Sequence, residues 1–143
     1  MQVAVAIVVL LLGLVGLVNS LYLTLVSYEV VKKKPSSTPG LCTPEEESCD
    51  EVSTKPESLV LGIPNSVFGM AYYVIISTAA IVRLVTGTWQ LMPLLTLVAV
   101  GAVIFSLYLA WMLIFRLRVF CRLCFLAHAI NITLAAIFLL IVF

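Results

Sequence analysis

The sequence predicts an all-α integral membrane protein, a four-transmembrane-helix bundle with one long polar loop between helices 1 and 2. Two observations carry this prediction. Of the 143 residues, 63% are hydrophobic and only 10% are charged, whereas about a quarter of the residues of a soluble domain are charged. The apolar residues also form four long runs, each able to cross a hydrocarbon core of about 30 Å as a helix. Lipid must therefore be the solvent for much of this chain.

The expected spans cover about residues 3–28, 67–84, 94–115 and 120–143, within a single domain, 1–143. The first span lacks the basic start and the small-residue cleavage site of a secretory signal, so we expect it to be a mature helix. Segment 29–66 is the expected loop, because it holds all seven acidic residues and four of the eight basic ones. Gly87, Thr88 and Pro93 predict a tight connection between the second and third spans.

Small and polar residues inside the spans are interpreted first as helix contacts. Asn19, Ser20 and Ser106 can form hydrogen bonds between helices, and small residues let helix backbones approach closely in lipid. The same close packing is expected at four glycines, Gly13, Gly16, Gly69 and Gly101.

The positive charges predict the orientation of the bundle. With four spans, the long loop and the start of the fourth span lie on one side of the membrane, and both termini lie on the other. Seven Lys or Arg residues fall on the loop side, and only Arg83 falls near the other side. Because positive residues near the spans stay in the cytoplasm, we expect the loop side to be cytoplasmic.

Cys121 and Cys124 form a CxxC motif at the start of the fourth span. A spacing of three places both sulfur atoms on one helical face, close enough for a disulfide. The positive end of the helix dipole, together with Arg118 and Arg122, stabilises thiolates there. The alternative interpretation is a pair of buried cysteines that serve only as small apolar residues.

Cys42 and Cys49 lie seven residues apart in the polar loop. A disulfide between them would close a short loop and add less stability than one that closes a longer loop, so it suits exchange better than structural support. A structural bridge remains the alternative. Two pairs on one side of the membrane permit a relay, in which a thiolate of one pair attacks the disulfide of the other. A lipid-soluble quinone could reach a CxxC motif just inside a membrane helix.

Several motifs together resemble the vitamin K epoxide reductase family. Three segments resemble its last two helices: Ser106-Leu-Tyr-Leu-Ala-Trp111, Phe120-Cys121-Arg-Leu-Cys124 and Ala129-Ile-Asn131. The segment Pro64-Asn65-Ser66-Val67-Phe68-Gly69, followed by Tyr72 and Tyr73, resembles the start of its second helix. Cys42 and Cys49 match its loop cysteines. The shortness of the chain, its minimal loops and the lack of a fused partner domain resemble a microbial, archaeal member of the family.

The resemblance implies an electron path from a separate thioredoxin-fold protein to a membrane quinone, menaquinone or similar. The partner's dithiol is oxidised at the Cys42–Cys49 disulfide by attack on Cys42. Cys49 then attacks Cys121, and Cys124 faces the quinone. Asn65 matches the quinone-contacting Asn of the family.

His128 marks a departure from vertebrate members, which have a Tyr four residues after the second CxxC cysteine. Spacings of four and seven place His128 on the same helical face as Cys124 and Cys121. Its imidazole can donate a hydrogen bond or a proton to a quinone oxygen, and a hydrogen bond within the bundle is the alternative. Three aromatic residues are further candidates for quinone contact: Phe68, Tyr72 and Trp111. For Trp111 the alternative is a position at the membrane interface.

The function predicted from the sequence is an enzyme, a quinone-dependent thiol oxidoreductase that generates disulfides. A metal-binding membrane protein is the alternative, with the four cysteines and His128 as ligands. The spacing of Cys42 and Cys49 is wide for zinc, and we expect no metal. A structural subunit with incidental cysteines is a third class.

The net charge of the chain and its expected location limit the kinds of partner that it can bind. A net charge of +1 gives no basic excess to neutralise phosphates, so nucleic acid is excluded as a partner. We expect a multi-pass monomer in the cell membrane. A cytoplasmic active-site side would be inverted relative to bacterial and animal relatives, and fits a hyperthermophilic archaeon, whose intracellular proteins are disulfide-rich.

Overall fold

The computed structural model describes residues 1–27, 59–60, 63–117 and 122–143. In these ranges, four helices are long and apolar enough to cross a membrane. They are α1 (Gln2–Ser27), α3 (Asn65–Thr86), α4 (Met92–Trp111) and α5 (Arg122–Val142), and α4 continues as a π-helical segment, Met112–Leu117. The four predicted helices are confirmed, and most of their ends lie within two residues of the expected ones. The exception is the end of α4, which lies four residues before the expected end at residue 115, where the π-helical segment continues the helix.

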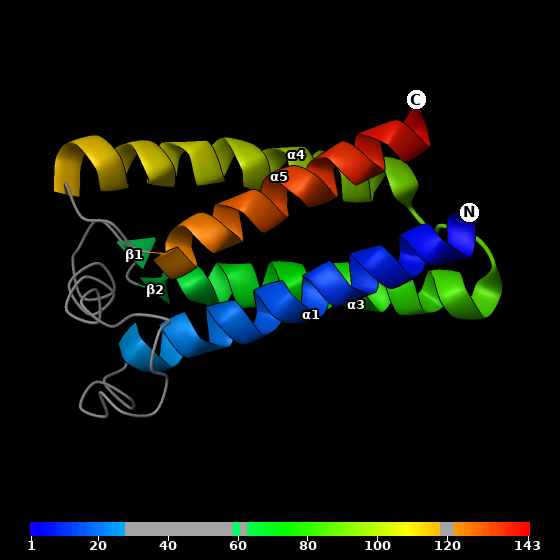
Figure 1. Cartoon of the computed structure of the whole chain (residues 1–143), viewed down its shortest axis with the longest axis horizontal. Coiled ribbons are helices and arrows are strands. Elements are labelled where there is room, and N and C mark those ends of the chain that lie inside the picture. The colour runs from blue at the N-terminus through cyan, green and yellow to red at the C-terminus, as the bar shows by residue number, and fades with distance from the viewer. Residues whose placement is uncertain (28–58, 61–62, 118–121) are drawn as a thin grey trace.

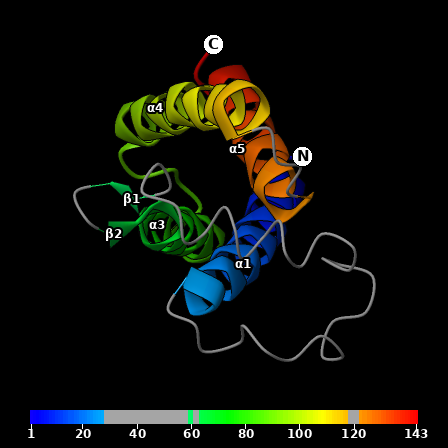
Figure 2. The same cartoon turned by 90° about the vertical axis from the view of Figure 1, so that its left-hand side faces the viewer.

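The helices form two pairs. α1 packs along α3, α4 packs along α5, and α1 also contacts α5. By contrast, α3 and α4 lie apart in Figure 2, although only residues 87–91 connect them. Both termini and the α3–α4 turn lie at one end of the bundle in Figure 1, as four antiparallel spans require.

The bundle is closely packed in the half near the termini. The core there includes Val9 of α1, Ile76 of α3, Ala99 of α4 and Phe138 of α5, all fully buried. The edge of the Trp89 ring contacts Phe138, with 5.9 Å between the ring centroids. This packing fixes the helices at one end, so that the other half can hold a cavity.

Glycines bring α1 and α3 into close contact. A Cβ atom on Gly13 would lie 2.5 Å from Ser77 Oγ, and a Cβ atom on Gly16 would overlap the ring of Tyr73. A Cβ atom on Gly69 would likewise press against α1. The expected close packing is confirmed at these three glycines, because only a hydrogen atom fits between the two helices.

The same expectation is wrong for Gly101. No described atom beyond the backbone of its own helix lies within 4 Å of the place a Cβ atom would take. Gly101 instead faces the cavity described below, so its small size leaves space rather than allowing a contact.

Replacing Gly16 by alanine is therefore expected to destabilise the fold, whereas Gly101→Ala is the matched control. The added methyl group at residue 16 must displace the Tyr73 ring, and overpacking of this kind costs about 1–3 kcal/mol. Thermal unfolding of both purified variants in detergent tests this expectation. An unchanged unfolding temperature for Gly16→Ala, or an equal decrease for Gly101→Ala, would contradict it.

The connection between α3 and α4 is as tight as expected. Gly87 ends α3 in the left-handed conformation, with φ 77°, and donates its N–H to the carbonyl oxygen of Arg83 at 2.9 Å. Leu91 precedes α4 with φ 55°, and Pro93 lies in the first turn of α4, where its missing N–H costs no hydrogen bond.

The expected loop, 29–66, needs a correction at its end. Leu59–Val60 (β1) pairs antiparallel with Ile63–Pro64 (β2), and α3 begins at Asn65. Aliphatic residues favour short strands, and Pro64, with φ −54°, presets the backbone for the helix that follows. Residues 28–58 and 61–62 lie outside the described ranges, so the long polar loop stays a prediction.

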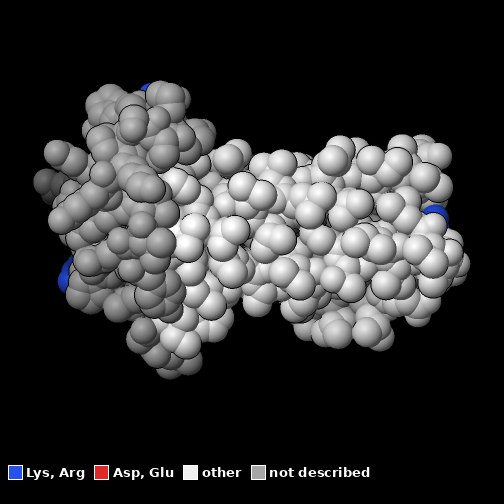
Figure 3. Space-filling view, turned by 90° about the horizontal axis from the view of Figure 1, so that it is seen from below, with Lys and Arg blue, Asp and Glu red and all other residues white. Residues whose placement is uncertain are grey.

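The surface of the described helices is apolar. Large side chains such as Leu97, Ile104 and Leu140 are exposed by 65% or more of their area. On the face shown in Figure 3, basic atoms appear only at the two ends of the molecule, and the described surface between them shows no charged residue. A belt of this kind is stable only in contact with lipid tails.

Candidate active site

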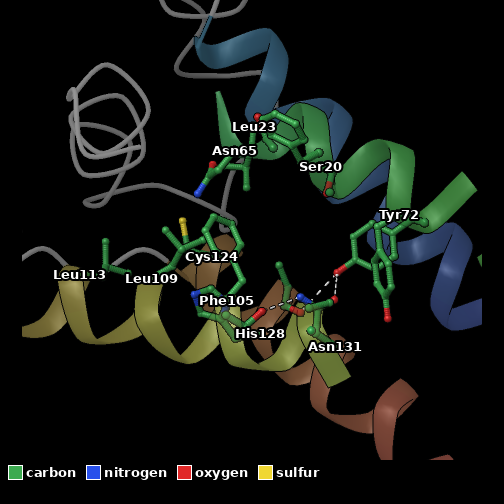
Figure 4. Close-up of a pocket in the computed structure, with 18 of the residues that line it drawn as sticks. Ser20, Leu23, Asn65, Tyr72, Phe105, Leu109, Leu113, Cys124, His128 and Asn131 are labelled. Carbon is green, nitrogen blue, oxygen red and sulfur yellow. Dashed lines mark hydrogen bonds between the residues drawn. The ribbon is translucent and has the colours of Figure 1, made fainter. Parts of the chain in front are cut away.

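A cavity of about 360 Å³ lies in the half of the bundle away from the termini (Figure 4). Small-molecule sites are typically cavities of this kind, mostly apolar with a few polar groups. The lining includes Ser20 and Leu23 of α1; Asn65, Ser66, Phe68, Gly69, Tyr72 and Tyr73 of α3; Val98, Gly101, Ala102, Phe105, Ser106 and Leu109 of α4; Met112 and Leu113 of the π-helical segment; and Cys124, Ala127, His128 and Asn131 of α5. None of these residues is Lys, Arg, Asp or Glu, so the wall offers hydrogen bonds rather than ion pairs.

α5 presents three functional side chains to this cavity. Cys124, His128 and Asn131 are spaced by four and three residues, which places them on successive turns of one helical face. Because α5 begins at Arg122, Cys124 lies in its first turn. The half-buried ring of His128 stands edge-on to Phe125, with 6.1 Å between the ring centroids.

Asn65 lies at the same end of the cavity as Cys124. It is the first residue of α3, directly after Pro64. In Figure 4 its side chain projects from α3 into the cavity, toward the side on which Cys124 lies. An amide supplies both hydrogen-bond donors and an acceptor, so this end of the cavity combines a thiol with a group that can hold a ligand oxygen.

A chain of hydrogen bonds forms another part of the wall. The Tyr73 hydroxyl donates to Asn131 Oδ1 at 2.7 Å, and Asn131 Nδ2 donates to Ser106 Oγ at 2.7 Å. The chain joins α3, α5 and α4, and so links the two helices that lie apart in Figure 2. Asn131 therefore bridges the open side of the bundle.

Two further hydrogen bonds hold the helix ends that surround the cavity. Asn19 Nδ2 of α1 donates to the carbonyl oxygen of Leu123, next to Cys124, at 3.0 Å. Thr24 Oγ1 of α1 lies 2.9 Å from Ser66 Oγ of α3. Hydrogen bonds between helices were expected of Asn19 and Ser106, and both are confirmed.

The comparison with known proteins decides the family. A model of the vitamin K epoxide reductase family matches residues 7–139, nearly the whole chain. This chain belongs to the vitamin K epoxide reductase family. The resemblance seen in the motifs is thereby confirmed, and the chain is a multi-pass membrane protein and a quinone-linked thiol oxidoreductase.

The cavity fits the quinone that this family uses. Its wall is mostly apolar, as a flat hydrophobic ring requires, and its polar groups come from all four helices. The Tyr72 side chain also lines the cavity, but its hydroxyl oxygen is fully buried and has no hydrogen-bond partner among the described residues. Tyr72 therefore contributes contact surface to the wall rather than an accessible hydrogen-bond donor.

The predicted site residues divide into three groups. Five of them line the cavity: Asn65, Phe68, Tyr72, Cys124 and His128. Trp111 is not among the described residues that line it. Cys42, Cys49 and Cys121 lie outside the described residues, so both cysteine pairings stay predictions.

Helix geometry turns Trp111 away from the cavity. It follows Leu109 by two residues, which turns its side chain roughly 200° away from the cavity face of α4. It is 54% exposed and contacts Phe115, with 6.2 Å between the ring centroids. Its exposed position favours the alternative interpretation, a residue at the membrane interface.

The metal alternative receives no support from the described part of the chain. No group of three or more His, Cys, Asp or Glu side chains is found there. Of the five proposed ligands only Cys124 and His128 are described, so the complete ligand set is not tested.

Sequence reasoning missed the role of the Tyr73–Asn131–Ser106 chain at the cavity. Asn131 and Tyr73 appeared only as parts of the family motifs, and Ser106 only as part of a motif and as a helix contact. One signal was available: Asn131 follows Cys124 by seven residues and His128 by three, and so continues their helical face. Which residues meet this face from α3 and α4 depends on packing.

Proposed function

We propose that this protein oxidises the dithiol of a thioredoxin-fold partner and passes the electrons to a membrane quinone, menaquinone or similar. The observation that carries the proposal is the cavity that brings the Cys124 thiol together with Asn65 and His128 among apolar side chains. A thiol at the wall of a quinone-sized cavity supports electron transfer at that point. Family membership supports the class of reaction.

The thiol–disulfide exchange steps carry two electrons from the partner's dithiol to Cys121 and Cys124. A thiolate of the partner attacks Cys42 and breaks the Cys42–Cys49 disulfide, which releases Cys49 as a thiolate. Cys49 attacks Cys121 and breaks the Cys121–Cys124 disulfide, which releases Cys124. When the partner's second thiolate displaces Cys42, and Cys42 then displaces Cys121, the partner leaves as a disulfide and Cys121 and Cys124 hold two electrons.

The residues of the cavity then serve the second half of the reaction. A bound quinone supplies an acceptor for two electrons and two protons. Asn65 holds a ring oxygen through its amide N–H, and His128 donates a hydrogen bond or a proton to a ring oxygen. The apolar wall, including Phe68, excludes water from the Cys124 thiol. Because all four helices of one chain build the cavity, we propose that the protein acts as a monomer.

The test is an assay with purified full-length protein in lipid nanodiscs. A reduced thioredoxin-fold protein and a quinone are added, and quinone absorbance and partner thiols are followed together. We expect one disulfide formed for each quinone reduced. Zinc analysis of the same sample examines the metal-binding alternative. Lack of quinone reduction, with stoichiometric zinc bound, would replace the proposal by that alternative.

We further propose that the active-site side faces the cytoplasm. The seven-to-one distribution of Lys and Arg supports this orientation. Of the described residues, Arg116 and Arg122 belong to the active-site end of the helices, and Arg83 to the other end.

Labelling with a membrane-impermeant thiol reagent tests the orientation. In reduced intact cells, a variant with Cys42 as its only cysteine is expected to stay unlabelled until the membrane is opened. The matched control carries Thr88→Cys in a cysteine-free chain, which places one thiol in the α3–α4 turn on the other side. Ready labelling of Cys42, with a protected control thiol, would show the opposite orientation.

A further inference from the structure

We propose that Tyr73, Asn131 and Ser106 form a reversible hydrogen-bond chain through which Ser106 binds the ring oxygen of both quinone and hydroquinone. The inference rests on the proposed function, because it concerns the ring that this function reduces. Ser106 is a ligand contact in this proposal, and Asn131 and Tyr73 are positioning residues.

The first support is the place of the chain. All three residues line the cavity, and Tyr73 and Ser106 are only 1% and 3% exposed. Polar groups buried from water and surrounded by lipid must find partners within the protein or in a ligand. The two hydrogen bonds of 2.7 Å fix Asn131 between a hydroxyl on α3 and a hydroxyl on α4.

In the direction observed, the chain ends in a donor. Tyr73 donates to Asn131 Oδ1, and Asn131 Nδ2 donates to Ser106 Oγ. The Ser106 proton has no acceptor in the described part of the chain, and a serine hydroxyl rotates to suit its partner. The cavity wall therefore offers one O–H donor, which matches the carbonyl oxygen of a quinone.

The reverse direction ends in an acceptor. If the Asn131 amide turns over, Nδ2 donates to Tyr73 Oη, and Oδ1 accepts the Ser106 proton. The Tyr73 proton then needs a new acceptor, and the carbonyl oxygen of Ala127 already lies 3.3 Å from Tyr73 Oη. Ser106 Oγ is left to accept a hydrogen bond, which matches the hydroxyl group of a hydroquinone.

In both directions each of the three side chains is hydrogen-bonded to its neighbour in the chain. A ring oxygen changes from acceptor to donor when the quinone is reduced, and a fixed donor would lose its partner at that moment. Turning over one amide avoids this loss without moving a helix. The proposal assigns the other ring oxygen to Asn65 and His128, since a 1,4-quinone carries its two oxygens on opposite sides.

The test measures binding of both redox forms rather than turnover. The probe is decylubiquinone, which has no open ring position for thiol addition, and its quinol. Affinities are measured in nanodiscs in a Cys124→Ala background, which prevents electron exchange, with correction for partition into empty nanodiscs. Ser106→Ala is expected to weaken both forms about tenfold, the loss typical of one buried hydrogen bond. Tyr73→Phe is expected to weaken both forms by roughly three- to tenfold.

Two variants serve as controls. Ser106→Thr keeps the hydroxyl and is expected to restore most of the affinity. Thr96→Val removes another buried hydroxyl of α4, which donates to Met92 of its own helix at 2.9 Å and does not line the cavity. Thr96→Val is expected to leave both affinities unchanged.

Vibrational spectra give an independent readout. In the Cys124→Ala background both C=O stretching bands of bound quinone are expected at hydrogen-bonded frequencies. In Ser106→Ala one band should move to its value in hydrocarbon.

Equal affinities of Ser106→Ala and its parent would overturn the proposal, as would a loss confined to one redox form. If the parent itself binds no quinone, the proposed function fails instead, so the two failures are distinguishable. Should Ser106→Ala not fold, Tyr73→Phe decides by the same criteria.

Discussion

Replacing Cys124 by alanine is expected to abolish quinone-linked thiol oxidation, with a loss of about 1,000-fold or more in kcat. Cys124 is the cysteine at the cavity wall in the described part of the chain, in the first turn of α5. Without its sulfur, Cys121 can form no disulfide within its pair, and electrons have no route from the thiols to the ring. The assay is quinone reduction by a reduced thioredoxin-fold protein in nanodiscs.

The matched control for this prediction is Leu126→Ala. Leu126 lies on the same helix two residues later, faces away from the cavity, and is 41% exposed. It is expected to retain nearly full activity. Equal activity of Cys124→Ala and the parent protein would contradict the proposed electron relay from the loop cysteines through Cys121 and Cys124 to the quinone. A rapid first reaction between partner and loop cysteines should survive in Cys124→Ala, because those steps precede the missing sulfur.

The second large effect is expected at His128. His128→Phe keeps a ring of similar size but removes both the hydrogen-bond donor and the proton donor, so kcat/KM for quinone should decrease roughly 100-fold. The half-buried ring lies one turn after Cys124 on the cavity face. Steady-state kinetics at varied quinone concentration give the measurement.

His128→Gln separates the two roles of the imidazole. Glutamine can donate a hydrogen bond but cannot transfer a proton at ordinary pH. If hydrogen bonding dominates, we expect His128→Gln to restore activity to within about tenfold of the parent. Activity of His128→Phe close to that of the parent would show that the histidine serves only the packing of the bundle.

Much of the fold could be predicted because lipid imposes simple rules. Backbone groups in hydrocarbon must be satisfied within a helix, so runs such as 94–115 had only one stable form. The sequence also predicted helix ends near Pro64 and Gly87, because the backbone conformations that proline and glycine favour are typical of helix ends. β1 and β2 were not predicted, because a pair of two-residue strands depends on contacts between neighbours rather than on a long pattern of residue types in the sequence.

The candidate site could be predicted only in part. The CxxC motif pointed to Cys124, helical periodicity placed His128 on the same face, and both residues line the cavity. For Trp111 quinone contact stays a prediction: its aromatic character suits a cavity, but its angle around α4 turns it away from the described lining residues. The expectation of close helix packing was wrong for Gly101, because small residues are used both where helices touch and where space is left open.

The sequence by itself determined that this protein is a membrane bundle of the vitamin K epoxide reductase family with a thiol at the start of its last helix. Composition, length of the apolar runs and spacing of motif residues are all local properties of the chain. Only the tertiary structure decided that α3 and α4 stand apart around a cavity, and that Asn131 bridges them through Tyr73 and Ser106. These three residues lie 33 and 25 positions apart in the sequence, and only the packing of α3, α4 and α5 brings their polar atoms within hydrogen-bond distance.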